Sequence, residues 1–414
     1  MVAVKLKLVS KGLDFPTSVA TDVAGCLYVA EAGLPFGGAS PGGRVWKVSR
    51  SGDRALLGEA FRPPVNGLTF HDGALYVSEG GHPGRITQLF LDGRRQVVLD
   101  HLPGPGNYHT NMTAFGPDGK LYFSQGAMTN SGVVGLDAYE LGWLGKLPHA
   151  CDAPGFDLVL TGLNFETEDP LSDTQGARTQ TGAFVPFGTR TRPGQTVVAQ
   201  LPCTASVMRC NSDGSQLELV AWGLRNAYGL RFTADGKLLA IDQGADDRGS
   251  RPIGNAPDAL FEVRSGAWCG WPDYVAGEPV TSEAYRPDRG GAPAFLIANH
   301  SQLPPPARPL FKFQPHAAAT KFDFVGQDLY AALFGDEKPL TAPDGPRCGR
   351  SVVRIDAKSW TMRDSVDGPF HRPIDVSFST LEGALYVLDF GRFEVHPGGG
   401  LKAEAGTGSL WRLT

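Results

Sequence analysis

Residues suited to binding an anionic ligand lie together near the middle of the chain. The run Gly223-Leu-Arg-Asn places Arg225 directly before Asn226. Arginine presents a planar fork of N–H donors that matches carboxylate or ortho-quinone oxygens, and asparagine adds a neutral donor. The pair therefore indicates a site for an oxygen-rich anion. The alternative is that Arg225 forms a structural salt bridge with a neighbouring repeat of the chain.

Oxygen atoms suited to a divalent cation follow shortly afterwards. The run Asp242-Gln-Gly-Ala-Asp-Asp-Arg brings the backbone carbonyls of Gly244 and Ala245 close to several carboxylates, and Asp258 lies a short distance further on. Carbonyl and carboxylate oxygens are the hard ligands that calcium prefers. This segment is therefore a candidate calcium site.

A repeated hairpin pattern must position these residues. Apolar runs return along the chain, each followed by a turn rich in Asp and Gly and then by Leu-Tyr-Val or a similar triplet. Asp-Gly favours the tight turn of a β-hairpin, and hairpins that recur every few tens of residues are typical of propellers. We predict an all-β, six-bladed β-propeller. The copies span residues 18–31, 67–79, 112–125, 229–242, 321–332 and 375–389.

The hairpins also predict where the chemistry takes place. A hairpin brings the residues before its first strand and after its second strand to the same end, and in a propeller these ends surround one mouth of the central channel. Polar residues gather at these positions. They are Thr17, Ser18, Asn66, His109, Asn111, Arg225, Asn226, His316, His371 and Arg372 before the first strands, and Glu31, Glu79, Gln125, Asp242, Gln243, Asp336 and Asp389 after the second strands.

The length and spacing of the repeats predict one domain with two insertions. We interpret residues 1–414 as a single propeller, with long loops at about 126–205 and 272–312 that are candidates for the walls of a substrate pocket. The first residues alternate like a strand, and we expect residues 3–9 to pair with residues 408–413 and close the ring. No signal peptide is visible.

Composition limits the partners. The chain has 38 basic and 43 acidic residues and a net charge of −5, without a basic stripe, so nucleic acid is not expected as a partner. No apolar run is long enough to span a bilayer. The six cysteines show no metal-binding spacing, and Cys203 and Cys210 are either a bridged pair or two buried thiols.

The order of these motifs resembles the soluble glucose/sorbosone dehydrogenases that depend on pyrroloquinoline quinone. The resemblance rests on Gly223-Leu-Arg-Asn, the Gln243-Gly stretch, Trp268-Cys-Gly-Trp-Pro and Arg372-Pro-Ile-Asp-Val, and it extends over nearly the whole chain. It implies a six-bladed propeller that oxidises a hydroxyl group of a sugar or polyol, passes hydride to the quinone, and delivers electrons to an external acceptor. It also implies a periplasmic or secreted location.

The resemblance assigns roles to individual residues. It implies that His109 is the catalytic base, that calcium is held by Gly244 and Ala245, and that Asp258 belongs to the same site. The residues that it implies for the quinone are Arg225, Asn226, Gln243, His316 and Arg372. Three features depart from the family pattern: Tyr108 stands at the register of the base, the segment that begins at Gln125 has no acid to orient the histidine, and Ile374 stands in place of a second arginine.

Two other functions fit the same architecture. A calcium-dependent lactonase on a propeller would use Glu31, Asn66, Glu79 and Asp242 as metal ligands, with a water activated by the metal. A non-catalytic propeller would use the mouth as a binding surface only. These functions can be distinguished, because a lactonase would need the metal but no quinone and a binding protein would catalyse no reaction.

Overall fold

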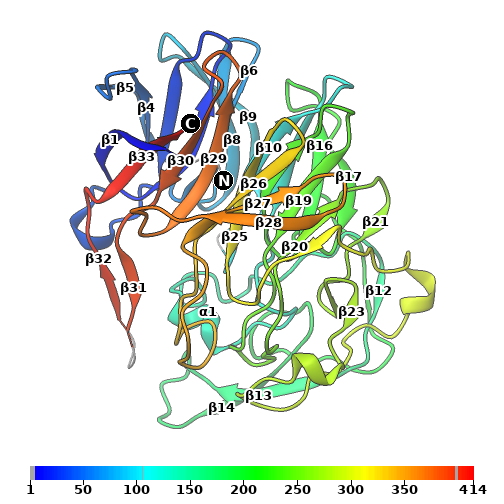
Figure 1. The fold of residues 1–414 in the computed structure, drawn as a ribbon. Coiled ribbons are helices and arrows are strands. Elements are labelled where there is room, and N and C mark those ends of the chain that lie inside the picture. The colour runs from blue at the N-terminus through cyan, green and yellow to red at the C-terminus, as the bar shows by residue number, and fades with distance from the viewer. Residues whose placement is uncertain (1–4, 105, 397–399) are drawn as a thin grey trace.

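The chain folds into six sheets arranged as the blades of a β-propeller (Figure 1), which confirms the predicted fold class. Neighbouring strands within the blades pair antiparallel, except that β17 and β21 of the third blade pair in parallel. The computed structural model describes residues 5–104, 106–396 and 400–414. Blade 1 consists of β2 (Pro16–Thr21), β3 (Leu27–Glu31), β4 (Gly43–Val48) and β5 (Arg54–Phe61). Blade 2 consists of β6 (Val65–His71), β7 (Ala74–Glu79), β8 (Gly84–Phe90) and β9 (Arg95–Leu102). Blade 3 consists of β10 (Thr110–Phe115), β11 (Leu121–Gln125), β16 (Ser206–Cys210), β17 (Glu218–Trp222) and β21 (Ala267–Trp268). Blade 4 consists of β18 (Ala227–Phe232), β19 (Leu238–Asp242), β20 (Ala259–Glu262) and β24 (Phe311–Lys312). Blade 5 consists of β25 (Ala319–Val325), β26 (Asp328–Leu333), β27 (Ser351–Asp356) and β28 (Thr361–Val366). Blade 6 consists of β29 (Pro373–Ser379), β30 (Ala384–Asp389), β33 (Gly408–Leu413) and β1 (Leu6–Leu13).

The six predicted hairpins form the two inner strands of the blades. In blade 2, His71 pairs with Ala74, so only Asp72 and Gly73 make the turn. Their φ angles are 45° and 76°. Two consecutive positive φ angles match the right-handed twist of the strands, which is why Asp-Gly is favoured there.

The innermost strands β2, β6, β10, β18, β25 and β29 contact one another in a closed ring around the channel. Buried polar side chains join neighbouring blades across this ring. The Ser18 hydroxyl donates to Asp375 Oδ2 at 2.8 Å, and Asn111 Nδ2 donates to Asn226 Oδ1 at 2.7 Å. These bonds fix the blades relative to one another and therefore fix the mouth that they surround.

The two ends of the chain close the ring within blade 6. β1 pairs antiparallel with β33, and Leu6 lies opposite Leu413. The predicted pairing of the termini is confirmed for the described residues, while residues 3 and 4 lie outside them. Leu13, at the end of β1, is fully buried in the core beside Phe15 and Phe390.

Long loops extend from one side of the blades, as Figure 1 shows for α1, β13, β14 and β23. β11 pairs directly with β16, so residues 126–205 leave the sheet between two neighbouring strands. Residues 263–310 likewise separate β20 from β24. The elements in the loops are η1 (Phe36–Gly38), α1 (Leu136–Glu140), β12 (Leu158–Val159), β13 (Asn164–Glu168), β14 (Arg178–Gly182), β15 (Thr196–Val197), β22 (Tyr274–Val275), β23 (Glu278–Pro279), η2 (Glu283–Tyr285), η3 (His300–Gln302), β31 (Phe393–Val395) and β32 (Leu401–Ala403).

Two further observations concern the described part of the chain. No helix in it is long and apolar enough to cross a membrane. Cys203 and Cys210 are both free and buried, and burial raises the pKa of the Cys203 thiol to about 11. A protonated buried thiol packs as a small apolar group, which answers the question that the sequence left open.

Candidate functional site

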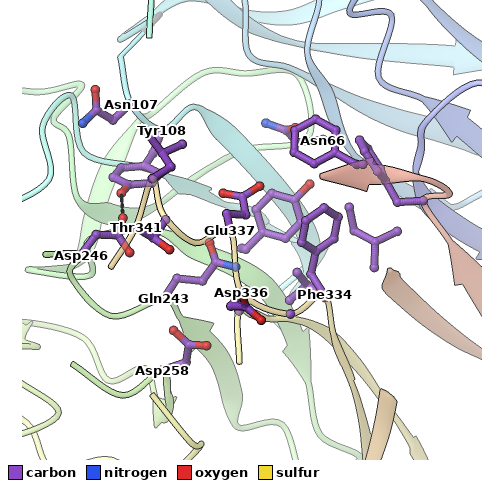
Figure 2. Close-up of a pocket in the computed structure, with 18 of the residues that line it drawn as sticks. Asn66, Asn107, Tyr108, Gln243, Asp246, Asp258, Phe334, Asp336, Glu337 and Thr341 are labelled. Carbon is purple, nitrogen blue, oxygen red and sulfur yellow. Dashed lines mark hydrogen bonds between the residues drawn. The ribbon is translucent and has the colours of Figure 1, made fainter. Parts of the chain in front are cut away.

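A cavity of about 310 Å³ lies at the mouth of the channel, where the starts of the inner strands meet the long loops. One part of its wall is apolar and aromatic, and the other is polar (Figure 2). The apolar residues include Leu34, Phe36, Phe334, Ile374, Phe390 and Phe393, and the polar residues include Asn66, Tyr108, His109, Arg225, Gln243, Asp246, Arg248, Asp258, His316, Asp336 and Glu337. A cavity with an apolar wall and a few polar groups is the usual form of a small-molecule site.

His109 precedes β10 and lines this cavity, as the hairpin argument predicts. It packs against Gly80, where a side-chain Cβ would lie 2.6 Å from the Cβ of His109. Its Nδ1 is buried and has no hydrogen-bond partner among the described residues. Burial lowers the pKa of His109 to about 4, because the apolar surroundings disfavour the imidazolium. At neutral pH the ring is therefore uncharged and able to accept a proton.

Arg225 lines the cavity as well, but protein groups already accept all of its N–H donors. Its Nη2 lies 2.6 Å from Asp246 Oδ2 and 2.7 Å from Asn130 Oδ1. It also donates to the Tyr108 hydroxyl and to the carbonyls of Gly244, Gln243 and Asn130. Arg225 therefore forms a structural salt bridge, but its partner Asp246 follows β19 of the same blade and does not come from a neighbouring blade.

Asn226 and Gln243 are linked within the wall of the mouth. Asn226 Nδ2 donates to Gln243 Oε1 at 2.7 Å, and Gln243 Nε2 donates to the Ala319 carbonyl at 3.2 Å. Gln243 faces the cavity, whereas Asn226 is buried behind it. Asn226 thus orients the Gln243 amide and joins blade 3 to blade 4.

The predicted calcium ligands Gly244, Ala245 and Asp258 differ in whether they line the cavity. Gly244 and Asp258 line it, and Ala245 lies behind them. Asp258 accepts N–H bonds from Gly244 at 2.9 Å and from Ala319 at 2.6 Å. Burial raises the pKa of Asp258 to about 7. No group of three His, Cys, Asp or Glu side chains converges to hold a metal within the described residues.

His316 and Arg372 occupy different positions relative to the cavity. His316 lines it, and burial lowers the pKa of its imidazole. Arg372 is 1% exposed and lies behind the wall, where Nη1 donates to the carbonyls of Phe334, Gly335 and Asp336. Its neighbour His371 is exposed, and Ile374 supplies apolar wall in place of a second guanidinium.

Two lining residues were not assigned a role from the sequence, although the position of Tyr108 was noted there. Tyr108 stacks beneath Arg225, with 4.3 Å between the guanidinium carbon and the ring centroid. Glu337 lies on the loop between β26 and β27, and Figure 2 shows it in the middle of the cavity. The sequence feature that could have identified Glu337 as a lining residue is its position beside Asp336, directly after a strand that ends at the mouth. Both acids line the cavity, and nothing in the local sequence indicated that Asp336 would pair with Arg347.

The carboxylates of the alternative metal set are bound within their own blades. Glu79 accepts two bonds from Arg85, at 2.7 and 2.9 Å, and Asp242 accepts the backbone N–H groups of Arg225 and Asn226. Glu31 accepts the N–H of Asp14 at 2.8 Å. Of the set, only Asn66 lines the cavity.

Solved structures share this fold over the whole chain. A putative oxidoreductase (glucose dehydrogenase) from Thermus thermophilus matches with 18% identity and a TM-score of 0.59, covering 100% of both chains. The quinone-bound aldose sugar dehydrogenase from Streptomyces coelicolor matches with 16% identity and a TM-score of 0.57, covering 100% of this chain and 98% of that one. The chain has the fold of the soluble sugar dehydrogenases.

A gluconolactonase from Xanthomonas campestris also matches, with 15% identity and a TM-score of 0.50, covering 100% of this chain and 90% of that one. No protein-family model and no curated protein matches the sequence. The structural likeness therefore confirms the fold that the sequence resemblance implies. The function must be inferred from the residues of the cavity.

Proposed function

We propose that this chain is a quinone-dependent dehydrogenase that oxidises a hydroxyl group of a sugar or related polyol and delivers the electrons to an external acceptor. The observation that carries the proposal is His109, an uncharged imidazole with one unpartnered buried nitrogen, in the wall of a cavity at the mouth. By the same resemblance, we place the protein in the periplasm or outside the cell.

The lining residues fit pyrroloquinoline quinone when calcium accompanies it. The apolar wall with its phenylalanine rings suits a flat ring system, and Gln243 and Arg225 border the polar side. Four carboxylates, from Asp246, Asp258, Asp336 and Glu337, line the cavity against the guanidinium groups of Arg225 and Arg248. A quinone that carries carboxylates adds negative charge, so a divalent cation is needed to offset the repulsion.

Each residue then has a defined task. The Gly244 carbonyl and the Asp258 carboxylate would hold calcium from the side of blade 4, and Gln243 and His316 would contact the quinone. Arg225 would contact the quinone only by giving up one of the protein acceptors that its N–H groups have in this structure. Bound quinone supplies the acceptor for the substrate hydride. His109 takes the hydroxyl proton at Nε2, since Nδ1 is enclosed by protein. Arg372 and Asn226 keep the wall in place from behind.

The test is to titrate metal-stripped protein with pyrroloquinoline quinone, with and without calcium, while following the quinone absorbance. We expect one quinone to bind tightly with calcium only, and sugars then to reduce an electron-accepting dye. His109→Gln should bind quinone normally and lose turnover by about 100-fold or more. Failure of the quinone to bind in both conditions contradicts the proposal.

A non-catalytic binding function has one observation in its favour, which is that protein groups accept all N–H donors of Arg225. If sugars bind to the protein and the quinone does not, this second function replaces the first. The lactonase function has less support, because Glu31, Glu79 and Asp242 do not line the cavity. Hydrolysis of a lactone that depends on calcium and needs no quinone would favour the lactonase function again.

A further inference from the structure

The loop that joins β26 to β27 forms a large part of the cavity wall. We call residues 334–350 the cavity loop. Phe334, Asp336, Glu337, Leu340 and Thr341 of this loop all line the cavity. In Figure 2, Glu337 lies in the middle of the cavity, to the right of Tyr108 and above Asp336. The cavity loop thus brings two carboxylates from blade 5, those of Asp336 and Glu337, into a site that residues of the other blades also line.

Arg372 holds the start of this loop. Its Nη1 lies 3.3, 3.1 and 3.0 Å from the carbonyl oxygens of Phe334, Gly335 and Asp336. These three residues directly precede Glu337 in the chain. Arg372 itself is buried, and its Nε donates to the Phe393 carbonyl. One guanidinium group therefore fixes the backbone from which Glu337 projects.

The two ends of the cavity loop are also joined to each other. The Asp336 carboxylate accepts bonds from Arg347 Nη1 at 2.6 Å and from the Cys348 N–H at 3.0 Å. Gly335 and Gly349 pack so closely that a Cβ on Gly349 would lie 2.5 Å from the Cα of Gly335. Only glycine permits this approach, so the neck of the loop is narrow and defined.

The far side of the loop is attached to the segments that follow blade 4. The Asp247 N–H donates to the Thr341 carbonyl at 2.9 Å, and Arg289 Nη2 donates to the Pro339 carbonyl at 2.6 Å. Glu337 therefore lies between two attachment points on opposite sides. Its position is determined by tertiary contacts on both sides.

Glu337 differs from the other carboxylates of the cavity. Asp246 pairs with Arg225 and Arg248, Asp336 pairs with Arg347, and both oxygens of Asp258 accept backbone N–H groups. The Glu337 carboxylate has no such partner among the described residues, and burial raises its pKa. It is thus an acceptor that remains available to a ligand.

We propose that Glu337 is the specificity-determining residue of the cavity, accepting hydrogen bonds from hydroxyl or ammonium groups of the substrate and excluding sugar acids and sugar phosphates. Arg372 is the positioning residue that holds it. This inference rests on the proposed function in one respect, namely that the substrate is a sugar or polyol. An unpaired carboxylate in a partly enclosed site repels an anionic ligand strongly. The proposed quinone enters together with calcium, whereas a sugar acid brings no cation.

The test compares the binding of glucosamine, glucose and glucuronate to the full chain by calorimetry, with and without quinone. We expect the wild-type protein to bind glucosamine at least about tenfold more tightly than glucuronate. Glu337→Gln should bring this ratio close to one. The matched control is Asp344→Asn, which removes an exposed carboxylate from the same loop and should keep the wild-type ratio.

A second variant tests the positioning role. Arg372→Lys keeps the positive charge but cannot donate to three carbonyls at once, so we expect the glucosamine-to-glucuronate ratio to fall while thermal unfolding remains cooperative. If this variant does not fold, Glu337→Gln decides alone. An unchanged ratio in Glu337→Gln overturns the proposal, and so does the absence of binding of all three sugars to the wild-type protein. Normal charge selectivity without quinone binding instead overturns the proposed function and leaves this inference standing.

Discussion

Arg225 and Asp246 form an ion pair with 2.6 Å between Nη2 and Oδ2, in the wall of the cavity at the mouth of the propeller. Arg248 shares the same carboxylate oxygen at 3.0 Å. One aspartate therefore contacts two guanidinium groups that are both removed from bulk water, and Arg248 has a second carboxylate partner in Asp137 at 3.3 Å. The ion pair joins the start of blade 4 to the segment after β19. We therefore expect substitutions of its two partners to lower the free energy of unfolding by unequal amounts.

Asp246→Asn should destabilise the protein more than Arg225→Met. The first change leaves the buried Arg225 guanidinium without its carboxylate, which costs about 3–5 kcal/mol, while Arg248 keeps Asp137 as a partner. The second leaves Asp246 paired with Arg248, so the loss is about 2 kcal/mol, mainly from unpaired acceptors. Urea unfolding of both variants gives the comparison. Equal losses would show that Asp246 does not hold both guanidinium groups.

His109 should keep its catalytic function to unusually low pH. Its folded-state pKa is about 4, below the ordinary value of 6.5, so the ring stays uncharged between these values. We expect kcat/KM to fall near pH 4 rather than near 6.5. Over the same interval the unfolded chain binds a proton that the folded protein does not, so the free energy of unfolding decreases as pH falls.

The control for this prediction is a histidine outside the cavity. His109→Gln should lose its part of the stability decrease between pH 6.5 and 4, whereas His149→Gln, on an exposed loop, should retain it. A wild-type activity profile that falls near 6.5 would show that His109 is more accessible to water than the structure indicates.

Lys321 should make stability increase at alkaline pH. Its ammonium group lies in the channel, donates to the Thr17 carbonyl at 2.6 Å, and stands 4.9 Å from the Tyr228 ring centroid. Burial lowers its pKa from 10.5 to about 8. Between these values the folded protein has released a proton that the unfolded chain still holds, so the free energy of unfolding rises with pH.

Lys321→Met removes this dependence while keeping a side chain of similar length. Urea unfolding at about pH 7.5 and about pH 9.5 should show a smaller rise for the variant than for the wild-type protein. Lys237→Met, at an exposed turn, is the control and should behave like the wild type. An equal rise in Lys321→Met would assign the effect to other groups.

Closure of the ring by β1 predicts a contrast between two leucines of one strand. Leu13 is fully buried and Leu8 is 39% exposed. Leu13→Ala should lower the free energy of unfolding by about 2–5 kcal/mol, because a cavity remains in the core. Leu8→Ala should change it by less than about 0.5 kcal/mol. Similar small effects would mean that β1 contributes little to the closed propeller.

The blades could be predicted because their signals are local. Asp72 and Gly73 make a two-residue turn, and the alternating residues on either side form the strands that the pattern indicates. The position of His109 followed from the same rule, since a residue before an inner strand must lie at the mouth. The closure by β1 was also predictable, because an alternating terminal segment needs a partner strand.

The orientation of side chains at the mouth could not be predicted in the same way. Arg372 and His316 both precede inner strands, yet Arg372 turns behind the wall and His316 faces the cavity. Asp336 and Glu337 are adjacent acids, and only Glu337 remains without a protein partner among the described residues. These outcomes depend on partners that are distant in the sequence.

The sequence by itself determined the six hairpins, the mouth at which their polar ends meet, and the presence of His109 there. Turn chemistry and strand alternation act over a few residues, so they can be read along the chain. Only the tertiary structure decided that Arg225 is bound to Asp246 and that Arg372 holds the loop of Glu337. The reason is that a buried charge takes its partner from whatever the fold brings within hydrogen-bond distance. Asp246 lies on the loop after β19, and the carbonyls that Arg372 binds belong to a loop of the neighbouring blade.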